Sequence, residues 1–285
     1  MNDFQRVSIF MTILRKIRTF TRIFRNSPRD AWDVLQLKVE VATGKSTHLW
    51  SSRRRATRRF EAMNTEPPGP HLTAYGNYLL DASRLPAKPI VFSAGVGEFI
   101  DFDLALLDRH DVQLVLIDPT PFSKRFIDGA GLPPNAVFCP VAIADLDGQI
   151  DLFADNLETD VQQTASVSSI DRGYGSQTLT VDCRRVKTLM EEQGVDRLDV
   201  LKLDIEGAAV AALRDTLAAG IYPTQIAAEF ERPRSRAAVR AYLAELTSLF
   251  SQMRGAGYRC YRTRPDLLGF QVEILAVRDD RTTGT

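Results

Sequence analysis

The chain has 285 residues, of which 44% are hydrophobic and 25% charged, and this ordinary globular composition excludes a largely disordered chain and a disulfide-stapled miniprotein. Its three cysteines are far apart and form no CxxC pair, which disfavours a disulfide framework and a structural zinc site. No apolar run approaches the roughly 20 residues that a membrane-spanning helix needs, and no cleavable secretory pattern opens the chain, so we expect a cytoplasmic protein.

The formal net charge of zero hides a basic N-terminal extension, which we place at residues 1–66. Residues 1–60 hold fourteen Lys and Arg against four Asp and Glu, which leaves 22 basic and 32 acidic residues for the rest. Residues 6–25 have the spacing of a basic amphipathic helix. We favour a helix docked on its own domain, and peripheral contact with an anionic membrane or an acidic partner is the alternative. The arginines of residues 53–59 indicate a solvated basic face rather than a specific nucleic-acid site.

A breaker cluster at residues 67–70 marks the start of a second region, which we place at residues 67–285. Short apolar runs alternate there with helical patterns, which predicts an α/β domain built on a mainly parallel sheet. Helices are expected at residues 101–109 and 239–253. The last two strands should pair as an antiparallel hairpin at the sheet edge. We predict strands at residues 90–92, 112–117, 136–143, 198–203 (a central strand), 224–230, 258–262 and 270–277.

The turn at residues 93–98 is the first candidate for ligand binding. Its glycines, Gly95 and Gly97, allow a sharp turn and a close approach of a ligand to the main chain, before a helix with free N–H groups. Ile100 stands where the third glycine of a dinucleotide fingerprint would be, so a nicotinamide or flavin site is disfavoured.

Acidic residues follow three other predicted strands. Asp118 ends the second strand, where an acid can accept hydrogen bonds from both hydroxyls of a ribose; an exposed helix cap is the alternative. Asp204 and Glu206 follow the fourth strand, and Glu229 and Glu231 end the fifth. These four carboxylates could orient a hydroxyl or accept its proton, cap the following helix, or hold a divalent cation.

These segments carry a family resemblance. Residues 91–103, 118–121 and 201–208 resemble the FkbM family of S-adenosylmethionine-dependent methyltransferases, and residues 75–78 and 225–230 fit as well. The resemblance covers about residues 70–278. It implies a Rossmann-like seven-stranded class I methyltransferase fold and O-methylation of a hydroxyl, often on a sugar.

The resemblance implies that the cofactor lies over Ser93 to Gly97 with its ribose on Asp118, and the other roles below are our own inference from the residues. Four carboxylates, Asp204, Glu206, Glu229 and Glu231, are the catalytic candidates, and the last two could act as general base. The segment from Asp155 to Gln177 is the expected substrate lid. The cofactor candidates are Ser93, Gly95, Gly97, Glu98, Asp118 with the ribose, Pro119, and Asp145 near the adenine.

Three departures from the family pattern bear on activity. Phe99 replaces an acidic residue, Ala209 replaces a glutamate, and Glu231 stands where a histidine is common. We therefore keep two functions open. The first is an S-adenosylmethionine-dependent methyltransferase acting on a hydroxyl of a sugar, glycolipid or related metabolite. The alternative is a catalytically altered binding protein of the same fold, recruited to a membrane or an acidic partner.

Overall fold

The computed structural model describes residues 60–154, 167–168, 177–231, 236–263 and 271–279. The amphipathic pattern at residues 6–25 and the arginines of residues 53–59 lie outside this part. Helical residues 60–64 open the described part, and Phe60 packs edge-on against Phe250, with ring centroids 5.2 Å apart. The division at residues 66 and 67 stays a prediction.

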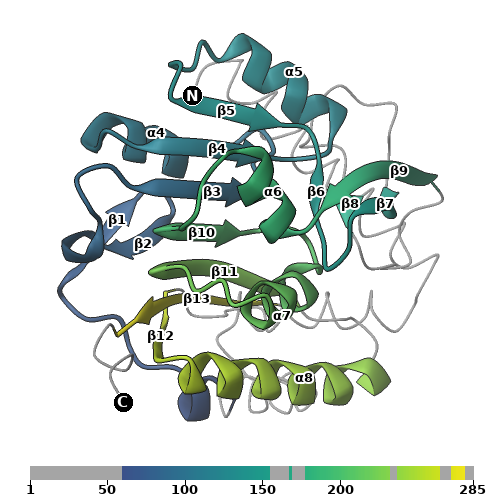
Figure 1. Ribbon diagram of the computed structural model, residues 1–285. Helices are drawn as coiled ribbons and strands as arrows, with labels where there is room; N and C mark the ends of the chain where they lie inside the picture. Colours follow the sequence, from purple (N-terminus) through teal and green to yellow (C-terminus); the bar gives the residue numbers. More distant parts are fainter. Residues whose placement is uncertain (1–59, 155–166, 169–176, 232–235, 264–270, 280–285) are drawn as a thin grey trace, which may run out of the picture.

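A seven-stranded sheet forms the centre of the molecule, in the order β12-β13-β11-β10-β3-β4-β5 (Figure 1). The five strands from β11 to β5 are parallel, whereas β13 is antiparallel to both of its neighbours. The Rossmann-like class I methyltransferase fold, the central position of β10 and the edge hairpin are therefore confirmed. The strands are β3 (Ile90–Ala94), β4 (Gln113–Ile117), β5 (Ala136–Cys139), β10 (Val200–Leu203), β11 (Gln225–Glu231), β12 (Tyr258–Arg262) and β13 (Gln271–Arg278).

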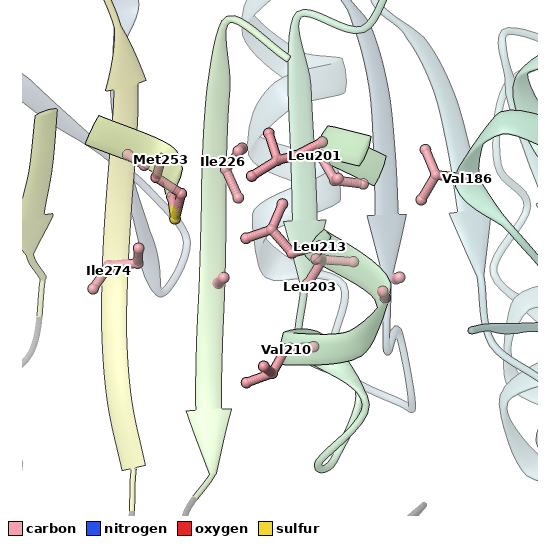
Figure 2. Close-up of a cluster of buried hydrophobic side chains, with 14 of the residues drawn as sticks. Val186, Leu201, Leu203, Val210, Leu213, Ile226, Met253 and Ile274 are labelled. Atoms are coloured by element: carbon pink, nitrogen blue, oxygen red, sulfur yellow. The ribbon is translucent and has the colours of Figure 1, made fainter. Parts of the chain in front are cut away.

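Three helices cover one face of the sheet: α6 (Val186–Glu192), α7 (Ala209–Ala218) and α8 (Arg236–Gly255). Alternate residues of each strand point to this face, since successive side chains of a strand point to opposite sides. Figure 2 shows Leu201, Leu203, Ile226 and Ile274 of the sheet beside Val210 and Leu213 of α7 and Met253 of α8. Leu246, Phe250 and Met253, from the helix predicted at residues 239–253, are buried in this cluster.

The opposite face is covered by the hairpin β1 (Leu72–Tyr75) and β2 (Tyr78–Asp81) and by α4 (Asp101–Arg109). Tyr78 and Phe102 meet there with ring centroids 5.4 Å apart. The Gln225 side chain fastens the hairpin to β11, because its Oε1 accepts from the Asp81 N–H (2.8 Å) and its Nε2 donates to the Asp81 carbonyl (3.0 Å). A short 3-10 helix, η1 (Ala82–Arg84), follows, and α5 (Pro121–Gly129) lies after β4.

The strand predicted for residues 136–143 is wrong as a single element. It divides around Pro140 into β5 and β6 (Ala142–Ile143), and β6 joins a second, four-stranded sheet with the order β6-β9-β7-β8. The other strands of that sheet are β7 (Gly148–Ala154), β8 (Val167–Ser168) and β9 (Gln177–Arg184). Residues 155–166 and 169–176 of the expected lid lie outside the described part, and β8 pairs with the end of β7. No helix among the described residues is long and apolar enough to cross a bilayer.

Candidate active site

The turn after β3 lies directly against the turn after β10. Gly95 has φ of 77°, a left-handed conformation that favours glycine, and its N–H donates to the Ile117 carbonyl at 2.9 Å. A Cβ added to Gly95 would lie 1.6 Å from the Asp204 carbonyl oxygen. The chain's own backbone therefore requires this glycine, and the predicted cofactor loop and the predicted acceptor turn are in contact.

Asp118 fixes the rest of the glycine loop from the end of β4. Its Oδ2 accepts from the Gly97 N–H at 2.9 Å, and its Oδ1 accepts from the Thr120 N–H at 2.8 Å and from the Thr120 hydroxyl. The side chain is buried, so it is not the exposed helix cap of the alternative interpretation. A carboxylate has about four acceptor positions, which leaves one on Oδ2.

The catalytic candidate Asp204 is bound by a residue that the sequence analysis did not assign to the site. The Tyr78 hydroxyl, at the start of β2, donates to Asp204 Oδ2 at 2.7 Å. Burial raises the pKa of Tyr78 well above its usual value, and the carboxylates of Asp204, Glu229 and Glu273 raise it further. The phenol therefore remains protonated and acts as a hydrogen-bond donor at any physiological pH.

The other predicted catalytic acids lie along the same edge of the sheet. Glu229 is half-buried and is the register partner of Glu273 on β13. Glu231, two residues further along β11, is buried. Glu206 has φ of 42°, which is uncommon for a residue with a side chain and stores local strain at this turn. Asp204 thus bonds the Tyr78 phenol, Glu229 acts on it electrostatically, and Glu206 lies on the same turn as Asp204.

Other cofactor candidates are more scattered. Ser93 is fully buried in β3, Glu98 and Pro119 are half-buried beside Gly97 and Asp118, and Asp145 is exposed between β6 and β7. Asp145 interacts electrostatically with Arg185 and Cys183 of the second sheet and its flank, so the structure places it with that sheet. The predicted adenine role of Asp145 stays a prediction.

A buried cation lies beneath the glycine loop. Lys202 of β10 is only 3% exposed, and its Nζ donates to the carbonyls of Ala94 and Gly95, each at 3.2 Å. Asp103 of α4 is fully buried and interacts electrostatically with this ammonium. Desolvation raises the pKa of Asp103, while the charge of Lys202 and the hydroxyl of Ser93 lower it in part. Sequence reasoning missed both residues, because a lysine within an apolar strand gives no sign of its partners.

A divalent cation is one of the ligands considered above for Asp204, Glu206, Glu229 and Glu231, which all lie in the described part of the chain. No group of three or more His, Cys, Asp or Glu side chains there is arranged to hold a metal ion. Asp204 accepts from the Tyr78 hydroxyl, and Glu273, the register partner of Glu229, accepts from the Thr263 hydroxyl.

Comparison with known proteins gives one family match. The model of the methyltransferase FkbM domain matches residues 98–260, which is more than half of the chain. No curated protein matches.

Several solved structures are loosely similar. A 1,6-didemethyltoxoflavin-N1-methyltransferase from Burkholderia thailandensis is 14% identical, with 89% of this chain and 91% of that chain covered and a TM-score of 0.32. A 16S rRNA (adenine(1408)-N(1))-methyltransferase mutant from Catenulisporales acidiphilia is also 14% identical, with 74% and 98% covered and a TM-score of 0.32. A mutant of MtNAS in complex with S-adenosylmethionine is 11% identical, with 92% and 83% covered and a TM-score of 0.35.

Proposed function

Because the chain belongs to the FkbM family of S-adenosylmethionine-dependent methyltransferases, we propose that it transfers the methyl group to a hydroxyl oxygen of a sugar, a glycolipid or a related metabolite. One observation carries this proposal. The glycine loop and the turn bearing Asp204 are in backbone contact at Gly95, so a donor on the loop and a hydroxyl on the acidic edge would be neighbours.

The residues around Gly97 fit the adenosyl part of the donor. The backbone turns through a left-handed conformation at Gly95 and Gly97, and the buried Asp118 carboxylate keeps one acceptor position on Oδ2. Asp118 would then hold one ribose hydroxyl while it fixes the Gly97 N–H. Accepting a second hydroxyl would displace one of its present donors. When bound, S-adenosylmethionine supplies a methyl group activated by a positively charged sulfur.

The acidic edge is suited to binding a hydroxyl group. Tyr78 already donates to Asp204 Oδ2, which leaves Oδ1 as an acceptor for a substrate O–H. A sugar hydroxyl is a very weak acid, so the base must take the proton while the new carbon–oxygen bond forms. Asp204 is our first candidate for that base, Glu229 is the second, and Glu206 and Glu231 would orient other hydroxyls. The protein's main contribution is to align the acceptor with the methyl group.

The first test is calorimetric titration of the full chain with S-adenosylmethionine and S-adenosylhomocysteine. Wild-type protein should bind both ligands. Asp118→Ala should weaken binding at least tenfold, because it removes the ribose acceptor and frees the Gly97 N–H. Asp128→Ala, on an exposed acid of α5 that pairs with Lys124, is the matched control and should bind as wild type does. A folded wild-type protein that binds neither ligand would refute the proposal.

The second test separates an enzyme from a binding protein. Methyl transfer from radiolabelled S-adenosylmethionine is measured against panels of hydroxylated glycans and glycolipids, with Asp204→Asn as the comparison. Turnover that falls at least a hundredfold in Asp204→Asn, with donor affinity unchanged, supports the assigned base. Donor binding without transfer to any hydroxylated acceptor would favour the catalytically altered binding protein, in which Phe99, 63% exposed beside the loop, is one altered position.

A further inference from the structure

The buried ammonium of Lys202 needs an explanation, because burying a charge is costly unless it is paired and hydrogen-bonded. Lys202 lies in β10, between β3 and β11, with Ser93 and Ala227 as its register partners. Most of its strand neighbours are apolar and pack in the two main cores. A leucine or methionine at this position would fill similar space without a charge.

Two of the three contacts of Lys202 reach the donor side of the site. Its Nζ donates to the carbonyls of Ala94 and Gly95, each at 3.2 Å. The Ala94 carbonyl also accepts from the Asp204 N–H at 3.1 Å, whereas Gly95 has already left the strand and turned into the left-handed conformation. The Lys202 ammonium therefore holds Gly95, the first residue after β3, by a hydrogen bond to its carbonyl.

The third contact reaches the acceptor side. Nζ lies 5.2 Å from the centroid of the Tyr78 ring, within cation–π range. The hydroxyl of the same ring donates to Asp204 Oδ2 at 2.7 Å. One cation thus contacts the loop proposed to hold the donor and the phenol that orients the proposed base.

The counter-charge comes from a third element. Asp103 of α4 interacts electrostatically with Lys202, and both are almost fully buried. Helix α4 begins directly after the glycine loop, so the pair also connects the far end of that loop to β10. The alternative is that Lys202 and Asp103 only compensate each other's buried charge. The test must distinguish that role from a role in positioning the site.

We propose that Lys202 is a positioning residue that couples the two halves of the site: it holds Gly95 through its carbonyl and Tyr78 through its ring, and so fixes the donor loop relative to Asp204. This inference rests on the proposed function. Lys202 touches neither reacting group and transfers no proton.

The test uses Lys202→Met, Asp103→Leu and the double variant in the full chain. Lys202→Met leaves the Asp103 carboxylate buried without its counter-charge, so the thermal midpoint should fall. The double variant removes both charges, so its thermal midpoint of unfolding should return most of the way to the wild-type value. Its affinity for S-adenosylhomocysteine should nevertheless stay at least tenfold below wild type, because Gly95 and Tyr78 are no longer held. Lys124→Met, on an exposed lysine of α5, is the control and should alter neither quantity.

Recovery of both the midpoint and the affinity in the double variant would overturn the proposal, since Lys202 would then only balance Asp103. Amide hydrogen exchange of the ligand-free proteins gives an independent readout. Residues 95–99 and 204–208 should both exchange faster in the double variant, and unchanged exchange in either segment would also overturn it. A wild-type protein that fails to bind S-adenosylhomocysteine would refute the proposed function, while the exchange data would still decide the coupling by Lys202.

Discussion

Replacing Gly95 by alanine tests the contact between the two turns of the site most directly. Two costs add at this position. A residue with a Cβ loses about 1–2 kcal/mol in the left-handed conformation, and forcing extra volume into a packed site costs about 1–3 kcal/mol more. The new Cβ would lie 1.6 Å from the Asp204 carbonyl oxygen, so one backbone segment must move. We therefore expect Gly95→Ala to lower the free energy of unfolding by about 2–5 kcal/mol.

The control for this substitution is Gly220, which follows α7. Gly220 has φ of 77°, the same as Gly95, but a Cβ added there meets nothing within 4 Å. Gly220→Ala should lose only the conformational term of about 1–2 kcal/mol, so the difference between the two variants isolates the clash.

Urea unfolding followed by circular dichroism gives both free energies. In a thermal scan each kcal/mol should appear as a shift of about 2–4 °C. Equal losses of unfolding free energy for Gly95→Ala and Gly220→Ala would show that the turns after β3 and β10 are not in contact. That result would refute the geometry proposed for the site.

Three further substitutions test contacts elsewhere in the fold. Asp147→Asn should weaken stability at neutral pH by less than about 1 kcal/mol, because the Arg185 N–H lowers the pKa of Asp147. That contribution is present above the ordinary pKa of an aspartate and is lost as the pH falls through the lowered pKa of Asp147, so the variant should lose less stability on acidification. Parallel pH profiles would contradict this. Gln225→Ala should remove two hydrogen bonds from the Asp81 backbone and lower the free energy of unfolding by about 1–3 kcal/mol for each group left unpaired. Hydrogen exchange of the Asp81 amide should become faster, and an unchanged exchange rate would contradict the role of Gln225. Phe230→Ala should cost about 3–5 kcal/mol in urea unfolding, since the ring is only 1% exposed, and a loss below 1 kcal/mol would exclude a core position.

The parallel sheet was predictable because its strands are buried on both faces. Such strands appear as continuous apolar runs, as residues 90–92 and 112–117 do, and the helix at Asp101–Arg109 was found at its observed ends. The end of a strand at a proline was harder to predict. Pro140 lies within a segment that otherwise has the composition of a strand, but a proline interrupts the hydrogen-bond ladder, so β5 and β6 on its two sides belong to different sheets.

Pairings over long sequence separations escaped prediction. The strands β7 and β9 alternate apolar and polar residues, with Leu152 and Val181 buried, but nothing in one sequence indicates that segments some 30 residues apart pair. The same holds within the site. Asp204 and Glu229 were found because acids at the carboxyl ends of parallel strands converge, whereas Tyr78 and Asp103 act through partners on other elements that only the fold brings near.

The bonds that join the hairpin β1–β2 to the sheet have a consequence for synthesis of the chain. Tyr78 is synthesised 126 residues before its partner Asp204, and Asp81 is synthesised 144 residues before its partner Gln225. At ribosomal speeds of about 5–20 residues per second, the hairpin emerges roughly 6–29 seconds before its partners. During that interval the hairpin lacks these two bonds to the sheet. A nascent chain that stops before β10 therefore lacks both of these bonds between the hairpin and the sheet.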